Sequence, residues 1–253
     1  MRCRRLFTFL LLLCLMLFAV VPAHATGFSI VNTRETDAER LLRGWDDEKG
    51  YIYIGFGNYP YTAEGDIRPV TWKVLGIENN YAFLLTQYVI DFAQYHHEKV
   101  TIEEWKLNDI YTTLNFTIRE KMFTEQELKA VRYSEEMGWL FYLTNKQLRT
   151  EAYGFKPWQL RPQKPRECAP TPYAMTHPEA WQDRGNGNTW YFSTGVPRRG
   201  FHNLIGYDGH TSTAANNRYG GVRPGCYVDL AMLDNVTGSG TIEDPYLFEV
   251  VDP

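Results

Sequence analysis

The fold is decided by the segment Val70-Thr71-Trp72-Lys73-Val74-Leu75, the turn Glu78-Asn79-Asn80 and the run Tyr81-Ala82-Phe83-Leu84-Leu85. Apolar and polar residues alternate across 70–75, which is the pattern of a half-buried β-strand. The turn leads into a second strand, so the two predict a hairpin. Upstream, residues 51–55 predict another strand, followed by a turn at Tyr59-Pro60-Tyr61. The chain is therefore expected to open with a β-meander.

The middle of the chain is predicted to be helical. Two helices are expected to begin at the capping boxes Thr101-x-x-Glu104 and Thr124-x-x-Glu127, whose side chains satisfy backbone amides that a first turn leaves unpaired. A strand is expected at 139–143, and a third, shorter helix is expected to be capped by Thr144 with Gln147. The buried stripe of the first helix is marked by three residues at four-residue spacing: Ile110, Leu114 and Ile118.

The region 154–253 is rich in Gly, Pro and Asn and predicts short strands joined by loops. Because strands and helices do not alternate as β-α-β units, the layout is α+β, with an N-terminal β-meander, a helical middle and a loop-rich C-terminal strand region. Residues 26–49 are expected to be a polar lead-in with at most a short helix near 37–43, and residues 50–253 a single domain. The short strands are expected at 190–193, 203–207, 221–230 and 246–250.

The first 25 residues predict a cleavable secretory signal peptide. Basic residues at its start precede an apolar run over 6–21, and Ala23-His24-Ala25 supplies the small-x-small cleavage site. The run is shorter than the ~20 residues that cross a bilayer, and no stop-transfer charges follow it. We therefore expect a mature chain that begins at Thr26, is secreted or held at the cell surface, and has no stable membrane insertion.

Charge and composition narrow the classes of partner. The signal segment holds three arginines and no acidic residue, which leaves 23 basic and 30 acidic residues, a net charge of −7. This balance argues against nucleic acid as the partner. Aromatic residues make up 15% of the chain, with 17 Tyr and 7 Trp. Their flat faces and polar edges suit sugar and protein surfaces, and they suit the core of a strand-rich fold equally well.

An ordered series of motifs runs from Gly50 to Asp229. Its members are Ile54-Gly55-Phe56-Gly57-Asn58-Tyr59-Pro60, Val70-Thr71-Trp72-Lys73-Val74-Leu75, Phe83-Leu84-Leu85-Thr86, Leu114-Asn115, Phe123-Thr124, Phe141-Tyr142-Leu143-Thr144, Thr171-Pro172-Tyr173-Ala174, Trp190-Tyr191 and Gly221-Val222-Arg223-Pro224. Taken together, the series resembles a family of bacterial exported proteins of unknown function, catalogued as DUF6273.

The resemblance implies a C-type-lectin-like fold, distantly similar to formylglycine-generating enzymes, and no known reaction. Fold-level kinship of this kind does not transfer chemistry. The chain departs from the family at Trp190-Tyr191-Phe192-Ser193-Thr194-Gly195, where relatives usually read Trp-Trp-Leu-Arg-Ser-Pro-Gly. This chain has no arginine in that motif, so any binding role of the relatives' arginine cannot be assigned to it.

Candidate ligand-binding residues are concentrated in the loop-rich region. His202, Asp208 and His210 could bind a metal or act as acid and base, although exposed loop polar residues give the same pattern. Neighbours on a strand point to opposite faces, so His96 and His97 are not expected to chelate jointly within regular structure. No metal site or cofactor is predicted, and no catalytic residue is assigned. The ligand-binding candidates are Tyr173, Trp181, Trp190, His202, Asp208 and His210.

Three residues are expected to have structural roles. Arg223, next to Pro224, is predicted to be a buried guanidinium that donates to loop carbonyls or a carboxylate, with a ligand-facing role as the alternative. Cys168 and Cys226 either form one disulfide or are two buried thiols. No C-x-x-C or H-E-x-x-H pattern occurs, so neither a zinc ribbon nor a zincin site is supported.

These features predict a non-catalytic exported binding module that presents loops over 152–218 to a glycan or protein at the bacterial cell envelope. One alternative is an enzyme, either of the formylglycine-generating type or a hydrolase that uses Asp208 and His210. A second alternative is a structural envelope protein.

Overall fold

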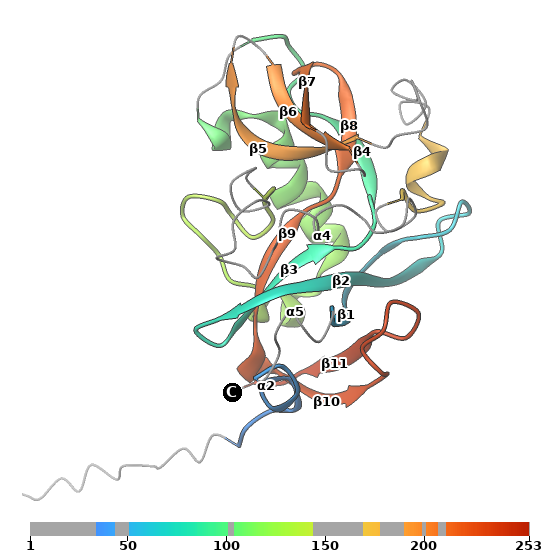
Figure 1. The fold of residues 1–253 in the computed structure, drawn as a ribbon, viewed down its shortest axis with the longest axis vertical. Coiled ribbons are helices and arrows are strands. Elements are labelled where there is room, and N and C mark those ends of the chain that lie inside the picture. The colour runs from blue at the N-terminus through green and yellow to red at the C-terminus, as the bar shows by residue number, and fades with distance from the viewer. Residues whose placement is uncertain are drawn as a thin grey trace, which may run out of the picture. The chain divides into compact units, whose positions relative to one another are not determined.

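The computed structural model shows a mixed α+β fold with two β-sheets and short helices (Figure 1). Residues from Glu35 onward belong to one compact unit. Among the described residues, no helix has both the length and the apolar character needed to cross a membrane. The predicted signal peptide and its cleavage site lie outside the described residues. The structure describes residues 34–43, 51–100, 104–143, 169–177, 190–198, 201–206 and 211–252.

The larger sheet has six strands and contains the predicted meander. The turn between β2 and β3 lies at Asn79 and Asn80, whose φ angles are 48° and 65°. Asparagine tolerates this left-handed conformation, which tight hairpin turns require. The first three strands pair antiparallel, as predicted, and β11 adds to β1 in parallel. In sheet order the strands are β10 (Leu233–Thr237), β11 (Tyr246–Val250), β1 (Tyr53–Pro60), β2 (Ile67–Glu78), β3 (Tyr81–Thr86) and β9 (Gly225–Asp229).

The smaller sheet has five strands. Its last three members in sheet order form an antiparallel meander, and β4 pairs antiparallel with β8. Strand β4 is the next strand after β3 in the chain. The chain therefore passes from the six-stranded sheet to an edge strand of the five-stranded sheet. In sheet order the strands are β4 (Asp91–Gln94), β8 (Tyr219–Val222), β5 (Trp190–Arg198), β6 (Phe201–Gly206) and β7 (Thr211–Ala215).

The single strand predicted over 221–230 is wrong in one respect. The chain forms two strands there, and β8 ends at Val222 while β9 begins at Gly225 in the other sheet. Proline has no backbone amide to donate to a ladder, and it restricts the residue before it, so Arg223-Pro224 interrupts the pairing. This two-residue interruption passes the chain from one sheet to the other.

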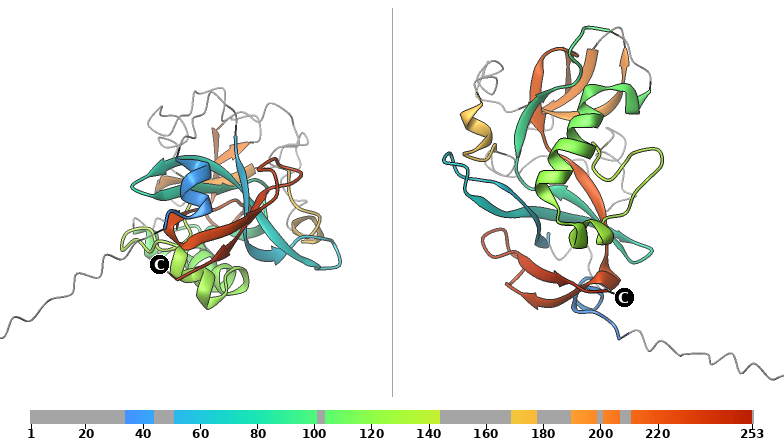
Figure 2. Two further views of the ribbon diagram at one scale, coloured as in Figure 1. Left: turned by 90° about the horizontal axis from the view of Figure 1, so that it is seen from below. Right: turned by 180° about the vertical axis from the view of Figure 1, so that it is seen from behind.

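The helical middle runs along both sheets, with its first part against β4 of the five-stranded sheet and its later parts against β1 and β11 of the six-stranded sheet (Figure 2). The predicted stripe of Ile110, Leu114 and Ile118 is confirmed, since all three residues are buried. The backbone across 113–118 is a π-helix rather than the expected α-helix. The segments are η2 (Trp105–Leu107), α3 (Asp109–Thr112), η3 (Thr113–Ile118), α4 (Arg119–Met122) and α5 (Glu125–Ala130); two further short helices are η5 (Ala174–Thr176) and η7 (Leu230–Met232).

The two predicted capping boxes have different outcomes. Thr124 and Glu127 form a complete capping box at the start of α5, as predicted. At the first box, Thr101 lies outside the described residues, and Glu104 precedes η2 without a side-chain capping bond. The α-helix begins only at Asp109, with Asn108 at its N-cap position.

The expected lead-in contributes to the core. Helix α2 (Asp37–Leu42) begins with a capping box between Thr36 and Glu39, and Ala38 and Leu42 are fully buried. The Thr36 hydroxyl also donates to the Leu230 carbonyl at 2.6 Å. This helix is therefore part of the compact unit, which polar composition alone did not indicate.

Two other predicted elements lie between α5 and η5. The strand expected at 139–143 is reduced to an isolated bridge between Phe141 and Gly225. The third helix, expected from Thr144, lies outside the described residues.

Candidate functional site

Several predicted site residues are not among the described ones. Trp181, Asp208, His210 and Cys168 lie outside the described residues, and the side chains of Trp190 and His202 do so as well. Among the predicted residues, the structure places the side chains of Tyr173, Arg223 and Cys226.

Arg223 lies in the two-residue break between β8 and β9, and only 7% of its surface is exposed. Its Nε donates to the Thr86 carbonyl at 2.8 Å, and the Thr86 amide donates to the Pro224 carbonyl at 3.0 Å. The guanidinium therefore contacts a backbone carbonyl of the last residue of β3, whereas the sequence predicted a loop carbonyl or a carboxylate as the acceptor. This contact ties the crossing at 223–224 to the six-stranded sheet.

Cys226 is a free and fully buried thiol in β9, opposite Leu84 of β3. Of the two alternatives left open by the sequence, the disulfide is not formed at this residue. Burial raises the pKa of the thiol well above its usual range. The thiolate is the nucleophilic form of cysteine, so this environment disfavours cysteine chemistry at position 226.

Tyr173 belongs to a polar group centred on Asp91, which we call the Asp91 cluster: Tyr59, Asp91, Tyr173 and His177. The Tyr59 hydroxyl donates to Asp91 Oδ2 at 2.7 Å, and His177 Nε2 lies 3.4 Å from Asp91 Oδ1. The Tyr173 ring contacts the edges of both neighbours, at centroid distances of 6.0 Å to Tyr59 and 5.3 Å to His177. Asp91 thus receives contacts from a phenol and an imidazole.

Burial decides the electrostatics of this cluster. Tyr59 is 2% exposed, and burial, followed by the charge of Asp91, raises the pKa of its hydroxyl far above the usual value. Burial also raises the pKa of Tyr173, with a further contribution from Asp91. Both phenols therefore stay protonated, and the Tyr59 hydroxyl acts as a hydrogen-bond donor to the carboxylate.

A shallow tyrosine-lined hollow adjoins the Asp91 cluster, and Tyr59 belongs to both. The Tyr61 and Tyr88 rings, both half-buried, meet edge to face at 6.2 Å, and the exposed guanidinium of Arg68 lies 4.9 Å from the centre of the Tyr61 ring. The cavity volume is about 20 Å³, enough for about one water molecule. A larger ligand would therefore lie across its rim. We call it the tyrosine hollow: Tyr59, Tyr61, Arg68, Pro69, Tyr88 and Thr171.

The backbone holds the tyrosine hollow together from three parts of the chain. The Tyr173 amide donates to the Tyr61 carbonyl at 2.9 Å, and the Thr171 amide donates to the Val89 carbonyl at 2.9 Å. These bonds tie the segment around η5 to the end of β1 and to the start of β4. The hollow is thus built on paired backbone.

Sequence reasoning missed most of this site. The turn predicted at Tyr59-Pro60-Tyr61 is wrong, because Tyr59 and Pro60 pair within β1, and both tyrosines of this motif line the hollow. The contacts of Asp91 with Tyr59 and His177 join distant segments that no local pattern connects.

A second polar group corrects the expectation for the paired histidines. His96, His97 and Asp109 have potential metal-ligating atoms that all lie within 4.8 Å of one another. The rule that neighbouring residues diverge holds inside a strand, but β4 ends at Gln94 and the histidines follow it in irregular backbone. The two rings can therefore turn to the same carboxylate.

Comparison with known proteins identifies no relative of this chain. No protein-family model, no curated protein and no solved structure matches it. The resemblance to the DUF6273 family stays a prediction, and function has to be inferred from the chemistry of the sites.

Proposed function

We propose that this chain is a non-catalytic, exported binding module with a C-type-lectin-like fold, and that it binds a glycan at the bacterial cell envelope through the tyrosine hollow. The observation that carries the proposal is the meeting of Tyr61, Tyr88 and Arg68 at the rim of a shallow, backbone-braced hollow.

The chemistry of the rim suits a sugar. Sugar rings present flat C–H faces that pack on aromatic side chains, while their hydroxyl groups need hydrogen-bond partners. Tyrosine supplies an apolar face and a polar tip, and Tyr61 and Tyr88 are both half-buried. The Arg68 guanidinium carries several donors and is exposed beside them. Rigid strands limit the entropy lost when a ligand binds.

A binding role also agrees with the state of the potentially reactive groups. The Asp91 carboxylate accepts from Tyr59 and contacts His177, and the Cys226 thiol is fully buried with a raised pKa. Neither arrangement provides an accessible nucleophile.

The glycan proposal is tested by a binding screen with the mature protein against peptidoglycan fragments, anionic wall polymers and a panel of neutral oligosaccharides. Tyr88→Ala and Arg68→Ala should each weaken binding of the retained glycan by about tenfold or more, which equals about 1.4 kcal/mol. Tyr133→Ala is the matched control, because Tyr133 is 41% exposed and lies outside the tyrosine hollow. Failure of the parent protein to retain any glycan, or equal binding by all three variants, contradicts the proposal.

The export part of the proposal has its own test. N-terminal sequencing of protein recovered from the culture medium or cell surface should begin at Thr26. Recovery of chains that begin at Met1 contradicts it.

A further inference from the structure

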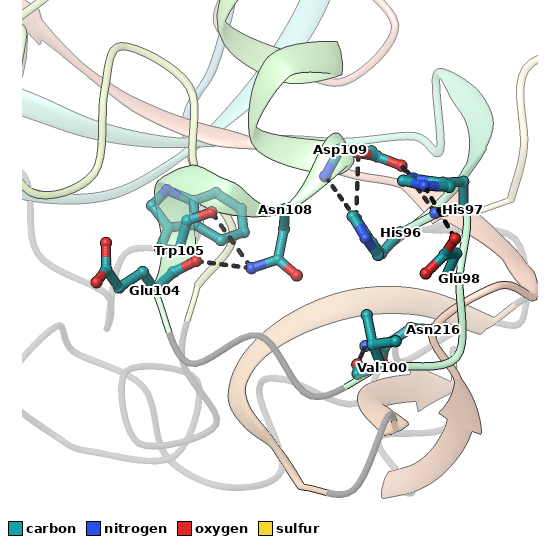
Figure 3. A network of polar contacts seen from close by, with 9 residues as sticks. All are labelled: His96, His97, Glu98, Val100, Glu104, Trp105, Asn108, Asp109 and Asn216. Carbon is teal, nitrogen blue, oxygen red and sulfur yellow. Dashed lines mark hydrogen bonds and ion pairs between the residues drawn. The ribbon is translucent and has the colours of Figure 1, made fainter.

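Three potential metal ligands meet between the end of β4 and the start of α3 (Figure 3). His96 Nδ1 lies 3.1 Å from Asp109 Oδ1, and His97 Nδ1 lies 2.6 Å from Asp109 Oδ2. The centres of the two imidazole rings are 4.3 Å apart. Each oxygen of one carboxylate therefore faces one imidazole nitrogen.

We propose that His96, His97 and Asp109 bind a divalent transition-metal ion of the zinc class, through two imidazole nitrogens and one carboxylate oxygen. The site is separate from the tyrosine hollow and does not depend on the proposed glycan binding.

The spacing of the ligand atoms fits such an ion. Zinc binds imidazole nitrogen and carboxylate oxygen at about 2.0–2.2 Å, so ligand atoms in a tetrahedral site lie about 3.4 Å apart. The separations of 3.1 and 2.6 Å join the two imidazoles to different oxygens of Asp109, and one ligand atom from each residue lies within 4.8 Å of the others, so side-chain rotations have to bring these three atoms to this spacing. The side chain of His97 is 63% exposed and that of Asp109 is 42% exposed, so both have room for that adjustment.

The donor set selects the class of ion. Imidazole nitrogen suits zinc, copper, cobalt and nickel, whereas calcium and magnesium prefer sites made of oxygen ligands alone. Two histidines with one carboxylate provide three protein ligands, which in zinc proteins leaves a further position for solvent or an external ligand. The exposure of His97 places that position at the protein surface.

The backbone holds the ligands in place. The His96 amide donates to the Asn216 carbonyl at 3.0 Å, and the Ile110 amide donates to the Tyr95 carbonyl at 3.1 Å. The first bond joins the residues after β4 to the segment before β8. The second joins them to the start of α3. Since His96 is 7% exposed and fixed on both sides, it provides a rigid ligand to which the exposed ring of His97 can add.

A second observation points to a ligand at this place. Asn108 is 1% exposed, and its amide nitrogen donates to the carbonyls of Glu104 and Trp105, while its Oδ1 has no partner among the described residues. Figure 3 shows this oxygen on the side of the amide that faces His96. Buried polar atoms are nearly always hydrogen-bonded, and a solvent ligand of a bound ion would supply the donor that Asn108 needs.

Asn216, which Figure 3 shows beside Val100, has a similar arrangement. It is fully buried, its amide nitrogen donates to the Val100 carbonyl at 2.7 Å, and its Oδ1 has no partner among the described residues. Asn216, whose backbone carbonyl accepts from the His96 amide, thus carries a second buried acceptor that has no partner among the described residues. A purely structural role of Asp109, as an acceptor at the first turn of α3, explains the histidine contacts but not these two oxygens.

The test is metal binding by the mature, untagged chain at neutral pH, with zinc and cobalt ions as probes. Calorimetry should show one zinc ion per chain, and cobalt should produce the visible absorption of a site with nitrogen ligands. His97→Ala is the main variant, because His97 is exposed and its loss should leave the fold intact. It should weaken zinc binding by about tenfold or more and remove the cobalt spectrum. Asp109→Asn should act in the same direction.

His177→Ala is the matched control, because His177 also contacts an aspartate, Asp91, at the other end of β4. Its zinc affinity should equal that of the parent. Zinc should also raise the thermal midpoint of the parent and of His177→Ala, but not that of His97→Ala, because a ligand that binds the folded state stabilises it. Absence of stoichiometric binding by the parent, or equal zinc affinities for His97→Ala and the parent, overturns the proposal.

Discussion

Two aspartates near the two ends of β4 have similar partners and different surroundings. Asp91 begins the strand and contacts Tyr59 and His177, with 16% of its side chain exposed. Asp109 contacts His96 and His97, which follow the strand, with 42% of its side chain exposed. A carboxylate enclosed by phenol and imidazole groups braces the fold, whereas one that meets a buried and an exposed imidazole has room to bind an ion together with them. Burial, more than the identity of the partners, separates the two roles.

The pKa values of titratable groups at the two aspartates also differ. Beside Asp91, at the start of β4, burial raises the pKa of Tyr59 beyond its normal range. Beyond the end of β4, burial alone would raise the pKa of Asp109. Hydrogen bonds from His97 and the nearby histidine charges outweigh this effect of burial and hold that pKa below its usual value. Asp109 is therefore ionised over the whole physiological range and ready to act as an anionic ligand.

The largest loss of stability is expected from Arg223→Ala, near Asp91 at the start of β4. Arg223 follows Val222, which pairs with Asp91, and its removal leaves the buried Thr86 carbonyl without this donor. The free energy of unfolding should fall by about 3 kcal/mol, and Arg223→Lys should restore only part of it because the planar fork is lost. Urea unfolding measures both, with the exposed Arg132→Ala as control. An unchanged midpoint for Arg223→Ala would show that the contact is unimportant.

Asp91→Ala should have the next largest effect. It leaves the Tyr59 hydroxyl buried without its acceptor, at a cost of about 2 kcal/mol. The reference is the parent protein in the same urea titration. A loss below about 0.5 kcal/mol, the size typical of surface substitutions, would mean that the enclosed carboxylate does not brace the fold.

Tyr59→Phe tests the hydrogen bond to Asp91 through the pH dependence of stability. At neutral pH the variant should lose about 1 kcal/mol, because one hydrogen bond to Asp91 is removed. The pKa of Tyr59 is raised in the folded state, so its contribution is fully present below the unfolded value of about 10 and is lost as pH rises toward the folded value. The stability gap between parent and variant should therefore narrow above pH 10.

Unfolding curves of both proteins between pH 7 and pH 11 measure this gap, and the other buried tyrosines cancel in the difference. A gap that widens above pH 10 contradicts the assignment.

Asp109→Ala without added metal should have the smallest effect. Exposed ion pairs contribute about 0–1 kcal/mol, so the unfolding midpoint should move little. Differential scanning calorimetry in a chelating buffer checks this value beside Asp91→Ala. If Asp109→Ala proves the more damaging of the two, the contrast between the two ends of β4 is wrong.

The sequence predicted the parts of the fold that depend on local pattern. The hairpin around Asn79 and Asn80, the stripe from Ile110 to Ile118 and the capping box at Thr124 are all present, because alternation, helical spacing and capping act over a few residues. The break at Pro224 was not predicted, because a single strand was expected over 221–230, and the assignment of its two sides to different sheets depends on long-range pairing.

The candidate sites were largely beyond sequence reasoning. The rule applied to His96 and His97 assumes regular structure, and the position at which β4 ends depends on its pairing with β8. The Asp91 cluster joins β1, β4 and the segment after η5, which only the folded chain brings together. Tyr173 was predicted as a site residue, but its partners could not be named.

The strand order of the six-stranded sheet also determines when the protein can fold. Strand β3 pairs with β2 on one side but with β9 on the other, and β1 is flanked on one side by β11, so strands from the first third of the chain need partners that are made last. Non-local pairings of this kind fold slowly, because loop closure precedes the contacts that reward it. The six-stranded sheet can therefore be completed only after the C-terminal strands β9, β10 and β11 have been made.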